Sequence, residues 1–199
     1  MGCRNGIFVK NARSKRFDTT GIKPSSSAVG LCKKQIDLFP YHGYLSFESD
    51  LPKNYGSLSA WDVNEHVSNP KMFLEICYSH LEKDGILLLE TPDESALIRK
   101  IINIIEMVAQ KFNSSATSNI YYPSHRFYFT HKSIRNLLTN SGFSDVRIYK
   151  EHSIYSKSIA KYKLYRNYSD TLLKIYSGLF TLLRAPIFWN KQVVLCRKA

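Results

Sequence analysis

Two acids and two histidines are the side chains in this sequence whose types could carry chemistry. Asp62, Glu65 and His66 stand close together in "WDVNEHV", and His125 comes much later, in "PSHRFYF". An ordinary imidazole pKa near 6.5 suits proton abstraction from a hydroxyl at neutral pH, so either histidine could serve as a general base. Each could equally make a structural hydrogen bond to nearby backbone, and the residues alone leave both roles open.

The same four side chains are also types that ligate metal ions. Their spacing matches no specific metal signature, and we therefore expect no metal site. The cysteines give no other indication, because they lie far apart in the chain without a C-x-x-C pair: Cys3, Cys32, Cys77 and Cys196. Neither a zinc knuckle nor a disulfide framework is predicted, and a reducing compartment fits best.

Strands and helices alternate along the chain and must position these residues. We expect helices over 5–16, from "KPSSSAV", from Pro70 to an end at Gly85, over "ESALIRKIINIIEMVAQKF", from a Thr130 cap through Leu138, and over about 157–184. We expect strands in "FDTTGI" ending at Ile22, in "LFPYHGYLSF", and in 57–63, 86–91, "FSDVRIYKEH" and "KQVVLCRK". This alternation predicts one α/β domain over 1–199 with a doubly wound, mainly parallel sheet. Ligands of such sheets bind beyond the carboxyl ends of the strands.

Five segments, in order, resemble class I S-adenosylmethionine-dependent methyltransferases of the small-molecule branch. They read "GCRNGIF", "GIKPS", "EHVSNP", "LEKDGILLLETP" and "HRFYFTHKSIRNLLTNSGF", and the resemblance runs in register from Gly2 to about Lys150. It implies a Rossmann-like methyltransferase domain that uses S-adenosylmethionine.

The resemblance also implies where the cofactor binds. The turn with Gly2, Cys3 and Gly6 would approach its methionine part and ribose through backbone amides. Lys23 would stand at the ribose and Tyr44 near the adenine. Asp62 and Val63 would line the methionine end, and His125 resembles a family histidine that faces the crevice.

Three departures from the family pattern fall on this site. Arg4 replaces a glycine where backbone should approach the ligand, and Lys23 replaces an acid, although an ammonium cannot accept hydrogen bonds from ribose hydroxyls. The first strand of the family, with its acidic end, is absent. We therefore expect an N-terminally truncated or misassigned start, or a fragment, with a degenerate or partner-completed protein as the alternative.

Two segments, 93–124 and 155–188, fall where the family builds its substrate lid. Their apolar and basic side chains suit an anionic or lipid-linked small molecule, or contact with a membrane surface, while plain helix packing explains most of the apolar positions. The C-terminal run "TLLKIYSGLFTLLRAPIFW" is interrupted by Lys174, Arg184 and Pro186, so it does not read as a membrane span.

The predicted function is methyl transfer from S-adenosylmethionine to a small-molecule oxygen or nitrogen, impaired if the chain is truncated. A non-catalytic methyltransferase-like binding or partner protein is one alternative. The formal net charge of +12 raises RNA methylation or binding as another. No N/D-P-P-Y/F motif is present, so nucleic acid is not the expected partner. No secretory signal opens the chain, and we expect a cytoplasmic protein, with membrane association as a further option. The oligomeric state is not predicted.

Overall fold

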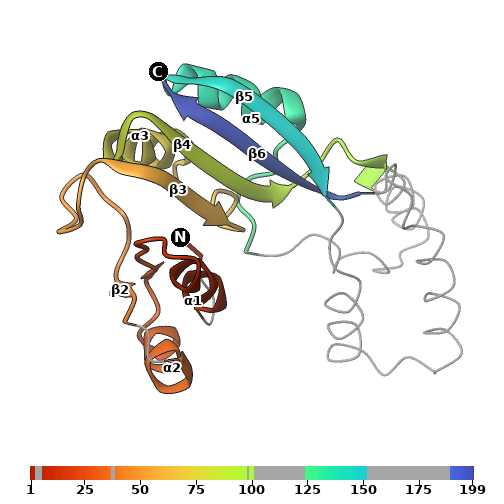
Figure 1. The fold of residues 1–199 in the computed structure, drawn as a ribbon. Coiled ribbons are helices and arrows are strands. Elements are labelled where there is room, and N and C mark those ends of the chain that lie inside the picture. Colours follow the sequence, from red (N-terminus) through yellow and green to blue (C-terminus); the bar gives the residue numbers. More distant parts are fainter. Residues whose placement is uncertain (3–5, 37–38, 98, 101–123, 152–188) are drawn as a thin grey trace, which may run out of the picture.

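The computed structural model describes residues 1–2, 6–36, 39–97, 99–100, 124–151 and 189–199. The helices are α1 (Ile7–Ser14), α2 (Ser26–Ile36), α3 (Pro70–His80) and α5 (His131–Asn140). The strands are β1 (Ile22–Lys23), β2 (Tyr41–His42), β3 (Tyr55–Trp61), β4 (Leu81–Pro92), β5 (Phe143–Glu151) and β6 (Lys191–Lys198). Figure 1 shows these elements in sequence colours.

The larger sheet has the order β3-β4-β6-β5. β3 and β4 run parallel, and β6 is antiparallel to both β4 and β5. Three of the four strands therefore point the same way, and the first residue of β6 lies beside the last residue of β4. The predicted α/β fold with a mainly parallel sheet is confirmed.

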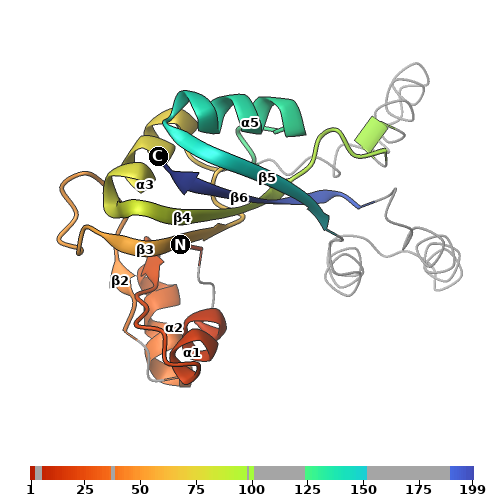
Figure 2. The ribbon, with the colours of Figure 1, turned by 45° about the horizontal axis from the view of Figure 1, so that its top comes forward.

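A separate pair of parallel strands, β1 and β2, forms a second sheet. Figures 1 and 2 show this pair, with α1 and α2, gathered beside the β3 edge of the larger sheet. α3 and α5 lie together on one face of that sheet (Figure 2).

Met1 pairs with the outer edge of β3. Its amino group donates to the Ser59 carbonyl, and the Trp61 amide donates to the Met1 carbonyl over 3.4 Å. These are the two hydrogen bonds that a residue opposite Ala60 would make in a parallel ladder. Met1 therefore stands where one residue of a further strand would stand. The expected absence of a first strand stays a prediction.

The core lies between the larger sheet and its two helices. Alternate residues of β4, Leu87 and Leu89, are fully buried, as are Val194 and Cys196 of β6. α3 and α5 contribute a second fully buried set from their inner faces: Leu74, Cys77, Ile134 and Leu138. Burial on this scale, at about 25 cal/mol per Å² of apolar surface, is the main force holding the sheet to the helices.

Helix starts are well predicted from the sequence. Asn69 caps α3 by accepting from the Met72 amide over 3.0 Å, with Pro70 at the first turn. Thr130 caps α5 by accepting from the Ser133 amide, and Ser133 in turn accepts from the Thr130 amide. Both caps satisfy amides that a helix leaves unpaired at its start.

Several predicted boundaries are wrong, and the strands expected over 57–63 and 86–91 are Tyr55–Trp61 and Leu81–Pro92. The strand expected in "FDTTGI" is only Ile22–Lys23, so it begins where it was expected to end. The third helix ends at His80 and not at Gly85, because Leu81 already pairs with Tyr55 in the sheet. Gly85 lies in an irregular part of β4, where a Cβ would come within 2.9 Å of the Glu82 carbonyl oxygen.

Most of both predicted lid segments, and the long helix expected over about 157–184, lie outside the described residues. In the part of the chain that the structure describes, no helix is long and apolar enough to cross a membrane.

Candidate active site

Gly2 packs against the end of β3 and the loop that follows it. Gly2 has φ +69°, and a Cβ there would lie 2.4 Å from the Trp61 carbonyl oxygen and 2.9 Å from Val63 Cγ2. Only glycine permits that approach, since the obstructing atom is backbone. Gly6, with φ +79°, is the N-cap of α1. Cys3 and Arg4 lie outside the described residues.

Asp62 and Val63 begin this loop, at the carboxyl end of β3. Asp62 has a left-handed φ of 50°, and its amide donates to the Glu90 carbonyl over 3.0 Å. Val63 is half-buried against the core. The structure thus brings together Gly2, Asp62 and Val63, three of the residues that the sequence predicts at the cofactor site.

A cluster of Glu65, His66 and His125 stands a few residues further along. One ligand-type atom from each lies within 4.8 Å of the others. The two imidazole rings meet edge to face with centroids 4.6 Å apart. His125 comes from the segment before α5, which is held to the loop because the amides of Arg126 and Phe127 both donate to the Glu65 carbonyl.

The tautomer of His66 follows from its partner. Its Nδ1 lies 2.8 Å from the Ser124 carbonyl oxygen, which can only accept, so Nδ1 carries the proton. Nε2 then keeps a lone pair. His66 therefore makes a hydrogen bond to backbone, as expected for a structural histidine. Its Nε2 is also able to take a proton, as expected for a general base.

Glu65 is the member of the cluster that the sequence did not single out as catalytic. It is 1% exposed, and Thr91 Oγ1 donates to its Oε2 over 3.1 Å. Burial is the largest cause that raises its pKa, to about 7, and the nearby Asp62 charge adds to this. A carboxyl with such a pKa can exchange protons near neutrality. Burial was the missing information. The sequence predicts that this acid opens the next helix, but the structure places it in the turn between β3 and α3, and α3 begins at Pro70.

Asn64 lies between Val63 and Glu65 in the loop after β3 and is also buried. It is 1% exposed, and neither polar atom of its side chain has a hydrogen-bond partner among the described residues. A buried amide without partners is costly, and a bound ligand or a water molecule would supply the partners that Asn64 lacks. The Gly2 turn and Asn64 together fit a polar ligand at the end of β3.

Lys23 and Tyr44 lie elsewhere, at the ends of the two-stranded sheet. Lys23 ends β1, and its carbonyl accepts from the Gly43 amide over 2.8 Å. The Tyr44 side chain is 77% exposed, which leaves its ring accessible for stacking. No described contact joins either residue to the Gly2–Val63 turn. The placement of Lys23 at the ribose and of Tyr44 near the adenine stays a prediction.

A metal ion is the other group that the cluster could hold. A carboxylate and two imidazoles are ligand types that zinc accepts. Glu65 and His66 already have protein partners in Thr91 and Ser124. The prediction of no metal stays a prediction.

The fold is that of a class I methyltransferase domain, and the comparisons agree. Residues 1–148 match the family described as "Methyltransferase domain", and the chain belongs to that family. The resemblance seen in the sequence is thereby confirmed.

The chain has low sequence identity to individual proteins of known function or structure. The chain is similar to the mitochondrial ubiquinone biosynthesis O-methyltransferase of Schizosaccharomyces pombe, at 27% identity over 106 residues. That match covers 50% of this chain and 39% of the yeast protein, so the chain spans about two fifths of that relative.

Two solved structures share the fold. A SAM-dependent methyltransferase from Archaeoglobus fulgidus has a TM-score of 0.62 at 16% identity, covering 99% of this chain and 83% of that one. Phosphoethanolamine N-methyltransferase 2 of Haemonchus contortus, in complex with S-adenosyl-L-methionine, has a TM-score of 0.60 at 15% identity, covering 99% and 47%.

Proposed function

We propose that this protein transfers a methyl group from S-adenosylmethionine to an oxygen or nitrogen of a small molecule. The observation that carries the proposal is the packing of Gly2 against the loop after β3, because that loop carries Glu65 and His66 and His125 lies beside them. Gly2, Asp62, Val63 and Asn64 would hold the methionine end of the cofactor. The sulfonium supplies a methyl group that is already activated.

The protein's own part is to orient the acceptor and to remove its proton. Nε2 of His66 has the lone pair for that step, because Nδ1 is committed to the Ser124 carbonyl. His125 lies against the same ring and would shape the acceptor side. Glu65, when ionised, would stabilise the imidazolium that forms. A hydroxyl acceptor needs such a base more than an amine does, which favours an oxygen nucleophile.

A methyl-transfer assay of two histidine variants tests this assignment. His66→Asn is expected to lower kcat by about 10²–10⁴-fold with a phenolic or alcoholic acceptor, while cofactor affinity changes little. His125→Asn tests the second imidazole in the same way. The matched control is His42→Asn, since His42 contacts the Pro24 carbonyl on the separate sheet. Full activity in both cluster variants would contradict the assignment. EDTA is expected to leave the rate unchanged.

A non-catalytic protein of this family remains the second candidate. It is favoured by Lys23, which cannot accept hydrogen bonds from a ribose. Calorimetry with S-adenosylmethionine separates the two candidates: a catalyst must bind it.

The finer features of the acceptor are also proposals. The net charge of +12 supports an acceptor that is an anionic or lipid-linked small molecule. For a lipid-linked acceptor, a cytoplasmic protein would contact the surface of a membrane. Binding to vesicles of anionic lipid, compared with neutral lipid, tests the membrane contact. RNA binding that weakens steeply with salt would instead support the RNA alternative.

A further inference from the structure

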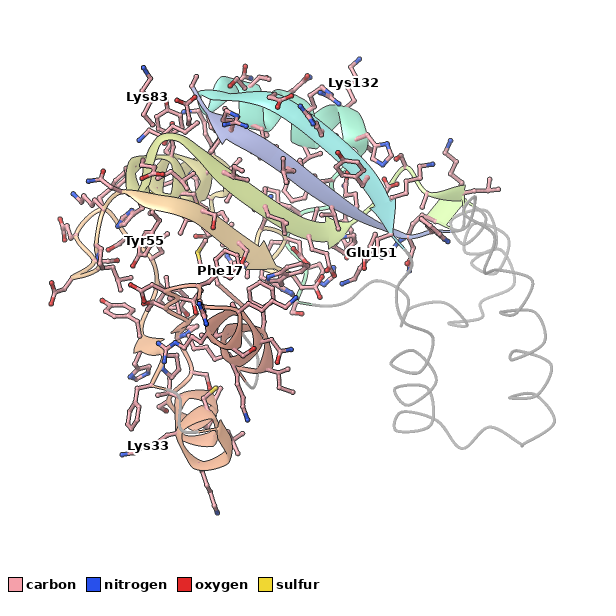
Figure 3. All side chains as sticks on the ribbon, viewed as in Figure 1. Phe17, Lys33, Tyr55, Lys83, Lys132 and Glu151 are labelled. Atoms are coloured by element: carbon pink, nitrogen blue, oxygen red, sulfur yellow. The ribbon has the colours of Figure 1, made fainter. Side chains whose placement is uncertain are left out.

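Lys191 joins three strands at the edge of the sheet where the candidate site lies. Its Nζ lies 2.8 Å and 2.9 Å from the two carboxylate oxygens of Asp62, and it also pairs with Glu90 Oε1. Because β6 runs antiparallel, its first residue sits beside the ends of β4 and β5, opposite Pro92 and Glu151. Figure 3 labels Glu151 at this edge and Lys83 at the other end of the sheet.

The trio is only partly accessible to water. The side chains of Lys191 and Glu90 are 18% and 13% exposed, and that of Asp62 is 49% exposed. Burial by itself lowers the pKa of Lys191, but the hydrogen bonds and charges of Asp62 and Glu90 outweigh it and raise the pKa. The lysine stays charged, so the trio carries a net charge of −1. Without Lys191, the carboxylates of Asp62 and Glu90 would face each other with only water to screen them.

Asp62 is where the site loop leaves the sheet. Its backbone is left-handed, with φ 50°, a conformation that Asp tolerates better than most residues with a side chain. The contacts here are the amide bond to the Glu90 carbonyl and the ion pair with Lys191. Val63, which contacts the Gly2 turn, comes directly after it.

We propose that Lys191 is a positioning residue for the cofactor, acting through Asp62. Lys191 bridges the carboxylates of Asp62 and Glu90 and so fixes the start of the loop after β3. That loop carries Val63, Asn64 and the Glu65–His66 pair. This inference rests on the proposed function, since it assigns the ligand of that same site.

The experiment compares two lysines of β6 by calorimetric titration with S-adenosylmethionine. Lys191→Met is expected to raise the cofactor Kd about tenfold or more. Lys198→Met is the matched control, because Lys198 donates to the Leu81 carbonyl and lies over the Tyr78 ring at the other end of the strand. Its Kd is expected to stay within about twofold of the wild type.

Two further variants separate positioning from loss of stability. Lys191→Arg is expected to keep most of the affinity, because a guanidinium can also donate to two carboxylates. Adding Glu90→Gln to Lys191→Met is expected to recover part of the cofactor affinity that Lys191→Met loses, since the net charge of the trio returns to −1. Equal Kd values for the wild type, Lys191→Met and Lys198→Met would overturn the inference while leaving the proposed function intact. No binding by the wild type would overturn the proposed function, and with it the inference that rests on it.

Discussion

Glu65 combines deep burial with a pKa raised to about 7 in the candidate site. An unfolded glutamate titrates near 4.5, so between these values the folded state holds a proton that the unfolded state has lost. The stabilising contribution is therefore full below about pH 4.5 and is lost as pH rises to 7. The loss is complete about one pH unit above 7, and the difference is constant beyond that.

Glu65→Gln removes this titration and gives the first prediction. Relative to the wild type, the variant is expected to gain about 2–3 kcal/mol of unfolding free energy between pH 4.5 and pH 8. Urea denaturation of both proteins at a series of pH values measures the difference. Two curves that stay parallel over this range would show that Glu65 does not carry the shift.

Gly2 gives the second prediction, because the space for a side chain is occupied by backbone. Gly2→Ala is expected to displace the turn from Trp61 and Val63 and to weaken cofactor binding by about tenfold or more. Gly30→Ala, in α2, is the control, since no atom lies within 4 Å of the added Cβ. That substitution is expected to be neutral or to stabilise by about 0.5–1 kcal/mol. Similar cofactor titrations for the two variants would contradict the role given to Gly2.

Residue types predicted part of the site, and burial and topology supplied the rest. Asp62, Val63 and His66 follow a strand directly, so their place at its end could be read from the sequence. His125 meets His66 only because its segment bonds to the Glu65 carbonyl. The role of Lys191 could not be predicted from the sequence. Nothing in "KQVVLCRK" indicates that this strand is antiparallel and begins at the end of the sheet where the candidate site lies.

At the scale of elements, capping residues and apolar runs predicted most of the larger sheet and its helices. Thr130 and Asn69 mark helix starts because their side chains satisfy free amides. Helix ends were harder: Gly85 suggested a helix end, but pairing of Leu81 with Tyr55 ended the helix earlier. Tertiary pairing of this kind has no local signal.

The outer edge of β3 carries the third prediction. Met1 already makes the hydrogen bonds of a parallel strand there, so a longer extended segment could continue the ladder toward Tyr55. Joining about five apolar, β-branched residues to Met1 is expected to raise the Tm by roughly 3–5 °C, corresponding to about 1–2 kcal/mol. A thermal denaturation scan measures this.

The control for that experiment is the same extension with prolines at alternate positions. Proline cannot donate to a ladder, so this version is expected to leave the Tm unchanged. An equal rise with both extensions would mean that the added residues do not pair with β3, and would contradict the inference that a further strand can pair with this edge.

At the scale of the whole molecule, the central claim is that the chain binds S-adenosylmethionine beside the loop after β3. Family membership and fold are consistent with this claim, while Lys23 opposes it at the ribose position. The most direct test is calorimetric titration of the folded protein with S-adenosylmethionine, with and without the added strand. We expect one site with a Kd of about 1–100 µM, competition by S-adenosylhomocysteine, and weaker binding by Gly2→Ala. A folded protein that gives no binding heat in either form would contradict it.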